Sequence, residues 1–283
     1  MHELDRFIME RPSGCLYHYT GAAGVIGILE SRDLWATDYR HLNDRQEYRL
    51  GARLLKEEIA ASRLTEKQRK TFEWLAAETQ SGCFVLSFSE RGDQLSQWRA
   101  YCPGGAGYAL GFGQDSGLFS VQAKQHSFNL VRCEYDPGKQ RQLCKYLVDS
   151  FIDGMATKQS WWPGGDVPSR VKSFLERYQW NLALALVMSA LKHRGFKEEK
   201  EWRLVSQYPE EALYGVSFRP GRFGVTPYFT LPIAAKKGPV EFEKIVIGPT
   251  PNQAASRTAL ELLLSKYETS AKRINLSLTP LRH

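Results

Sequence analysis

The sequence predicts one α+β domain over residues 1–283, with a helical insertion at about 138–193. Three observations lead to this prediction. Strand-like runs in the first half, such as "CFVLSFSE", alternate with segments whose apolar residues recur at helical spacing. The middle of the chain has helical periodicity. The last part has a strand, a helix and a strand at the spacing of a crossover unit.

The first half begins with a short strand at 15–19 and a helix for which Thr20 is the expected N-cap. A strand at 33–38 precedes a long helix that starts near Asp44 and carries an apolar stripe. The stripe consists of Leu50, Leu54 and Leu55. The other elements expected in this half are a helix at 66–79, a strand at 83–90, a short helix at 93–101 and a strand at 108–113.

The second half continues with the helical segment, which a Pro/Gly-rich loop at 161–168 interrupts. This loop carries two tryptophans, and we expect it to form a mobile flap. Strands are then expected at 201–205, 228–233 and 242–248, followed by a helix at about 252–266 and a last strand near 275.

Composition indicates a soluble globular protein, since 42% of the residues are apolar and 12% are aromatic. The N-terminus lacks the basic-then-apolar plan of a secretory signal, and the longest apolar stretch, 182–191, is far shorter than the roughly 20 residues of a membrane span. We therefore expect a cytoplasmic location and no membrane partner. The cysteines and histidines are dispersed without metal-binding spacing, so reduced thiols and no metal site are expected.

A net charge of +7 would help to recruit an anionic partner, such as nucleic acid, a dinucleotide or a phosphorylated substrate. The charge is spread along the chain, however, with only small clusters at Arg219 and Arg222 and at Lys236 and Lys237. This distribution favours a moderately basic surface over a dedicated nucleic-acid footprint.

The segment "FKEEKEWRLV" at 196–205 holds the strongest candidate for chemistry. In an extended chain Glu199, Glu201 and Arg203 share one face, while Trp202 and Leu204 share the other. Two carboxylates on one face would suit acid–base work on a substrate. The alternative is an ordinary solvated strand edge, with a surface ion pair between Glu201 and Arg203 worth less than ~1 kcal/mol.

Other candidates carry little weight when each is taken alone. A histidine between two tyrosines, at His18, is more often structural than functional, and the strand hydroxyls of Ser87 and Ser89 are commonly just exposed. The aromatic residues Trp98 and Tyr101, spaced by one helical step, are typical of a core. The Gly-rich run at 105–111 follows a helix and opens a strand, which is the reverse of a dinucleotide-binding loop.

Taken in order, the motifs resemble a bacterial family known only as a domain of unknown function, DUF2971. They are "LYHYT", "LWATDYRHLND", "LSFSE", "QWRAY", "GYALGF", "EEKEWRLV" and "IVIGPT", and they span most of the chain. That family in turn looks like a divergent relative of the ADP-ribosyltransferases. This likeness implies a split mixed sheet around an NAD-binding cleft, with NAD as the substrate.

The resemblance implies a role for each candidate. Glu201 would hydrogen-bond the ribose 2-hydroxyl as positive charge develops, and Glu199 would orient or deprotonate an acceptor. His18 would hold a ribose hydroxyl, Ser87 or Ser89 would donate to the carboxamide, and Arg203 would reach the pyrophosphate or pair with Glu201. The aromatic residue that stacks on nicotinamide stays open among Tyr39, Trp98 and Tyr101.

We therefore expect an enzyme that cleaves the nicotinamide glycosidic bond of NAD and transfers ADP-ribose to protein, nucleic acid or water. A role in toxin or antiphage biology is suggested only by the family likeness. Two non-catalytic alternatives are a nucleic-acid-binding module, using the basic residues named above, and an interaction protein, using Trp161 and Trp162.

Overall fold

The chain was analysed as a computed structural model that describes residues 3–42, 45–81, 83–102, 107–120, 128–156, 180–207, 215–221, 224–234 and 239–280. Helices and strands are mixed along the chain, so the expected α+β class is confirmed. The helical elements are α1 (Glu3–Met9), α2 (Ala22–Ser31), η1 (Tyr39–His41), α3 (Arg45–Ala61), α4 (Glu66–Ser81), α5 (Leu95–Tyr101), α6 (Gly117–Ser120), α8 (Pro137–Ala156), α10 (Trp180–Ala190), η2 (Arg194–Glu199) and α11 (Gln253–Lys266).

The strands mostly lie where the sequence predicts them. They are β1 (Leu16–Gly21), β2 (Asp33–Asp38), β3 (Cys83–Ser89), β4 (Gly107–Phe112), β5 (Asn129–Arg132), β6 (Glu201–Gln207), β7 (Ser217–Gly221), β8 (Gly224–Pro232), β9 (Val240–Phe242), β10 (Lys244–Ile247), β11 (Thr269–Ala271) and β12 (Ile274–Leu276). The expected crossover unit is confirmed, because β10 and β12 pair in parallel and α11 connects them through β11.

The main sheet branches at β3. Its path runs β12-β10-β4-β1-β3-β2-β8-β7, and β6 and β5 continue from β3 on the other side. Along one edge β3 pairs with β6 over its whole length. Along the other edge β2 pairs with Phe84 and Val85, whereas β1 pairs only at Ser89. The sheet is therefore split between β1 and β2.

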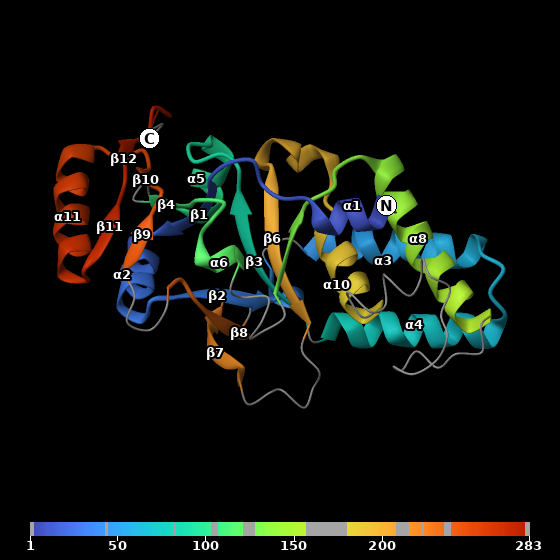
Figure 1. Ribbon diagram of the computed structural model, residues 1–283. Helices are drawn as coiled ribbons and strands as arrows, with labels where there is room; N and C mark the ends of the chain where they lie inside the picture. The colour runs from blue at the N-terminus through green and yellow to red at the C-terminus, as the bar shows by residue number, and fades with distance from the viewer. Residues whose placement is uncertain are drawn as a thin grey trace.

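Both faces of the sheet are covered by apolar side chains. One face carries a core that includes Leu16, Leu110 and Trp202. The other face carries a core formed with α3, α4, α8 and α10, and a smaller cluster of Tyr17, Tyr19 and Trp98 next to β1. Figure 1 shows these four helices gathered at one end of the molecule, with α11 and β11 at the opposite end.

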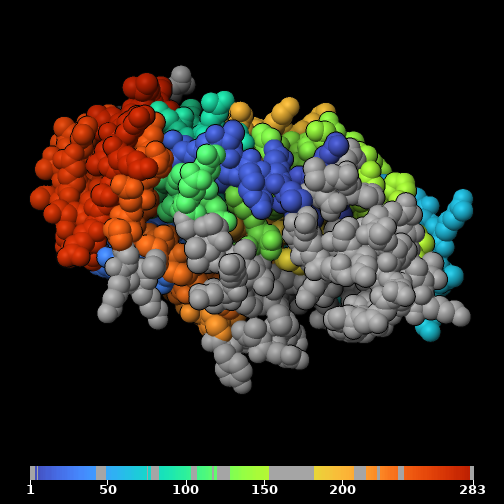
Figure 2. All heavy atoms as spheres, in the orientation of Figure 1, coloured from blue at the N-terminus to red at the C-terminus, as the bar shows by residue number. Residues whose placement is uncertain are grey.

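The helices follow from their apolar patterns. The α10 segment is apolar almost all round, which is typical of a buried helix, and Leu184, Leu186 and Val187 are fully buried. The stripe predicted for α3 is confirmed by the burial of Leu54 and Leu55. On the space-filling surface the N-terminal segment lies between the C-terminal elements and this helical end (Figure 2).

One local prediction needs correction, and two others lie outside the described residues. The N-cap of α2 is Gly21, with no side-chain cap bond, because Thr20 still belongs to β1 and pairs with Tyr108. The predicted start of α3 at Asp44 and the loop with Trp161 and Trp162 lie outside the described residues.

Among the described residues no helix is both long and apolar enough to cross a membrane. The single-domain organisation stays a prediction.

Candidate functional site: a buried carboxylate cluster

Strand pairing brings the predicted serines next to the predicted carboxylate. In the antiparallel ladder of β3 and β6, Ser89 lies opposite Glu201 and Ser87 lies opposite Arg203. Directly opposed residues project from the same face of a sheet, so these four side chains share one face. Trp202 and Leu204 project from the other face into the core there, as the alternation in the sequence predicts.

The position of Glu199 corrects the sequence prediction. It does not lie on the strand, because residues 194–199 form η2 and Lys200 has a left-handed backbone with φ of 43°. The strand begins only at Glu201. The carboxylate of Glu199 nevertheless comes back to the same place, since Lys192 bonds to both glutamates.

Lys192 is the central cation of the cluster. Its ammonium lies 2.5 Å from Oε2 of Glu199 and also donates to Oε2 of Glu201. Arg203 donates to the two oxygens of Glu201, from Nε at 2.7 Å and from Nη2 at 3.0 Å. Arg203 also donates to the carbonyl of Ser189 at the end of α10. Two cations and two carboxylates thus form one hydrogen-bonded network.

This network is buried, which contradicts the surface ion pair considered from the sequence. The side chains of Lys192, Glu201 and Arg203 are only 6%, 6% and 3% exposed. Burial opposes ionisation of Glu201, but Arg203 and Lys192 outweigh it and lower the pKa of that carboxyl to about 2. Glu201 is therefore ionised at neutral pH.

The aromatic candidate that adjoins the cluster is Tyr101. Its pKa is raised by desolvation and by the negative charge of Glu201, so its hydroxyl stays protonated. Its side chain is 39% exposed at the end of α5. By contrast, Tyr39 is buried and donates to the carbonyl of Met188, and Trp98 is buried and donates to Asp93. Of the three residues, only Tyr101 is both partly exposed and close to the carboxylates.

His18 lies on the other face of the sheet from Glu201. Tyr17 pairs with Ser89, which places Tyr17 on the face of Glu201 and the next residue, His18, on the opposite one. There the ring of His18 packs against Phe88. Its Nδ1 lies 3.1 Å from the carbonyl of Ser87, within the split between β1 and β2. Desolvation lowers the pKa of His18, so its imidazole is neutral.

Ser89 has a structural hydrogen-bond pattern. Its hydroxyl donates to the carbonyl of Glu199 at 2.6 Å and accepts from the amide of Arg91 at 3.0 Å. These bonds hold the end of β3 against the turn that precedes β6. Ser87 is partly exposed and is the serine of the pair that lies nearer the split.

The described residues give little support to a nucleic-acid-binding module built on the basic residues or to a metal site. Arg219 stacks on Trp35 and donates to Thr37, so it is held against the sheet. Arg222, Lys236 and Lys237 lie outside the described residues. Within the part of the chain that is described, no group of three His, Cys, Asp or Glu residues lies close enough to hold a metal ion.

The sequence reasoning missed Lys192 and Tyr135. The hydroxyl oxygen of Tyr135 accepts a hydrogen bond from the amide of Glu201 at 2.9 Å and so fixes the start of β6. The sequence gives no signal for Lys192, because a lysine that follows an apolar helix is expected to extend its ammonium to solvent. A buried lysine needs an anionic partner, and the nearest carboxylates along the chain are those of 198–201.

A known family model matches the part of the chain that contains this cluster. Residues 97–204 match the DUF2971 family model. The family is described as a protein of unknown function, and the likeness expected from the sequence is confirmed over these residues. The DUF2971 match includes Tyr101, Lys192 and the segment 199–203, whereas His18, Ser87 and Ser89 precede it. Searches of curated proteins and of solved structures found no match.

Proposed function

We propose that the chain binds NAD at the carboxylate cluster and cleaves its nicotinamide glycosidic bond, with Glu201 as the essential carboxylate. The observation that carries this proposal is a Glu201 held ionised by Arg203 and Lys192 close to Tyr101, an aromatic residue that is partly exposed. A fixed negative charge next to an aromatic surface suits a substrate that develops positive charge on a ribose attached to a flat ring.

The chemistry would proceed as a dissociative substitution. The bond between ribose C1 and the nicotinamide nitrogen breaks, and its electron pair leaves with nicotinamide, which departs neutral and needs no acid. The ribose becomes oxocarbenium-like, and a hydrogen bond from its 2-hydroxyl to Glu201 strengthens as charge grows. Water or a nucleophilic acceptor then attacks C1, and its proton passes to a base, for which Glu199 is the candidate.

Binding would require one exchange of partners. Both oxygens of Glu201 are bonded to Lys192 and Arg203. A ribose hydroxyl can replace Lys192 at Glu201 while Lys192 keeps its bond to Glu199. Arg203 would remain in place, because it also holds the end of α10 through Ser189.

An ADP-ribosyltransferase-like fold is part of this proposal. The split of the sheet at β3 supports it, since a split sheet is what the family likeness implies. The role expected for His18 is left out, because its ring lies on the face opposite Glu201. The acceptor, whether protein, nucleic acid or water, is to be identified by experiment.

The test is release of free nicotinamide from NAD by the purified protein, measured by chromatography with and without added DNA, RNA or cell lysate. We expect release by the wild type and a loss of about 100-fold or more in Glu201→Gln. Glu198→Gln is the matched control, since Glu198 is exposed on η2 next to the cluster.

A second variant guards against misfolding of Glu201→Gln. Tyr101→Ala removes a partly exposed ring, so it should fold normally and raise the KM for NAD. If the wild type releases no nicotinamide under any of these conditions, the catalytic proposal is wrong. The dependence of release on one added component would identify the class of acceptor.

A further inference from the structure

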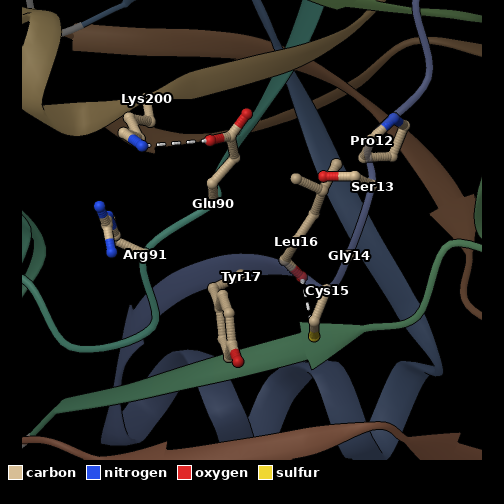
Figure 3. A pocket seen from close by; sticks show the side chains of 9 residues that line it. All are labelled: Pro12, Ser13, Gly14, Cys15, Leu16, Tyr17, Glu90, Arg91 and Lys200. Atoms are coloured by element: carbon tan, nitrogen blue, oxygen red, sulfur yellow. Dashed lines mark hydrogen bonds and ion pairs between the residues drawn. The ribbon is translucent and has the colours of Figure 1, made fainter.

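A concave site lies beside the buried cluster. It is a cavity of about 290 Å³ formed by the N-terminal segment 12–17, by Glu90 and Arg91 after β3, and by Lys200 before β6. Figure 3 shows the side chains of Arg91 and Lys200 on one side of this space and Cys15 and Pro12 on the other. Its volume is at the low end for a small-molecule site, so it suits part of a ligand.

The charge around the cavity is positive. Among the described residues that line it, the one carboxylate is that of Glu90, which already accepts from the indole of Trp202 at 2.9 Å and lies 3.4 Å from Arg132. Lys200 approaches Glu90 only at 3.8 Å and is 39% exposed. Among the described residues Arg91 has no ion-pair partner within 4.0 Å. The cavity therefore offers two cations that the local carboxylate does not fully neutralise.

Two neutral polar groups, the thiol of Cys15 and the hydroxyl of Tyr17, belong to residues that line the cavity, and they hydrogen-bond to each other. Burial raises the pKa of Cys15 to about 11 and also raises the pKa of Tyr17, so both groups keep their protons at neutral pH. The ring of Tyr17 fits tightly between two glycines. A Cβ at Gly92 would lie 2.6 Å from this ring, and one at Gly111 would lie 2.9 Å from it.

The cavity and the carboxylate cluster are built on the same strand ends. Tyr17, Ser89 and Glu201 are neighbours across three adjacent strands and share one face. Adjacent strands lie about 4.8 Å apart, so Tyr17 is ~10 Å from Glu201 across the sheet. The amide of Glu90 also donates to the carbonyl of Lys200 at 3.1 Å, which ties the two cavity walls together.

We propose that this cavity binds the phosphate groups of a nucleotide, with Arg91 and Lys200 as the charged contacts. Cationic side chains around a small polar space are the chemistry that recognises phosphate. The identity of the nucleotide as NAD rests on the proposed function. The diphosphate would occupy the cavity, and the nicotinamide ribose would reach Glu201.

The test is calorimetric titration of the wild type, Arg91→Gln and Lys200→Gln with ADP, and of the wild type with adenosine. We expect the wild type to bind ADP and each variant to bind it at least about tenfold more weakly, because each loses a charge-assisted hydrogen bond. Adenosine, which has no phosphate, should also bind the wild type at least about tenfold more weakly than ADP does. Lys197→Gln, which removes an exposed lysine from η2, is the control and should bind ADP like the wild type.

The outcomes separate the two proposals. Equal binding of ADP by the wild type, Arg91→Gln and Lys200→Gln would overturn the phosphate site, and so would equal affinity of the wild type for ADP and adenosine. If ADP binding depends on both residues but no nicotinamide is released, the phosphate site stands and NAD cleavage does not. If nicotinamide is released with the same KM in both variants, NAD cleavage stands and the phosphate site does not.

Discussion

At the scale of single residues, the most consequential feature is that Glu201 is ionised inside the protein. Charges are removed from water at a cost of several kcal/mol each, and only good geometry with further hydrogen bonds offsets it. Glu201 meets these conditions, because Arg203 binds it in a bidentate manner and Lys192 binds it from a third direction. Loss of one partner would leave an uncompensated buried charge.

This predicts a specific dependence of stability on pH. The pKa of Glu201 is lowered from 4.5 to about 2 on folding, so its ionised form stabilises the fold above about pH 4.5, and that contribution is lost as the pH falls toward 2. At pH 7 Glu201→Gln should lower the free energy of unfolding by about 3 kcal/mol. The difference from the wild type should shrink as the pH falls from 5 to 3.

Urea denaturation followed by tryptophan fluorescence at a series of pH values measures this difference. The exposed Glu198 supplies the control, since Glu198→Gln should differ from the wild type by less than about 0.5 kcal/mol at every pH. A difference between Glu201→Gln and the wild type that stays constant from pH 7 to 3 would show that Glu201 is not held ionised by its partners.

At the scale of elements, α5 is positioned by a carboxylate outside the cluster. Asp93 accepts from the indole of Trp98 at 2.8 Å, from Ser277 at 2.5 Å, from Thr279 at 2.9 Å and from the amide of Leu278 at 2.8 Å. Desolvation would raise the pKa of Asp93, but these donors outweigh it and lower the pKa. One side chain thus fastens the segment 277–279 to the helix that carries Tyr101.

We predict that Asp93→Ala releases this segment without unfolding the protein. Limited proteolysis should cut the chain near Leu278, which is 92% exposed already, much faster than in the wild type. The loss of stability should be about 1 to 2 kcal/mol, because the lost bonds lie near the surface. Asp115→Asn, at another exposed aspartate, should leave the cleavage rate unchanged; equal rates in wild type and Asp93→Ala would contradict this role.

The helices and strands also show which features can be predicted from the sequence and which cannot. Periodicity located most strands and helices, and alternation placed Glu201 and Arg203 on one face and Trp202 on the other. It failed for Glu199, because the left-handed conformation of Lys200 ends the alternation there. The side of the sheet that carries His18 depends on its pairing register with β3, and register is a property of two distant segments that one strand pattern does not encode.

At the scale of the whole molecule, β3 and β6 form the centre of the sheet. Hydrogen-bonded neighbours occupy both edges of β3 at Phe84 and Val85 and both edges of β6 from Trp202 to Val205, whereas β7 lies at the end of the path. Backbone amides of Phe84 and Val85 in β3 and of Trp202 to Val205 in β6 should therefore be among the slowest to exchange with deuterium, and those of β7 among the fastest in the sheet. Mass spectrometry of exchanged peptides measures this order, and equal protection of β3 and β7 would contradict it.

The branch at β3 also bears on how the protein is made. Glu90 and Trp202, which are bonded where β3 and β6 meet, are 112 residues apart in the sequence. A ribosome adds about 5 to 20 residues per second, so the partner of β3 is synthesised about 6 to 22 s after β3 itself. During that interval an apolar strand has an open edge, which can pair with other chains. Nascent chains that stop before β6 are therefore the species most in need of a chaperone.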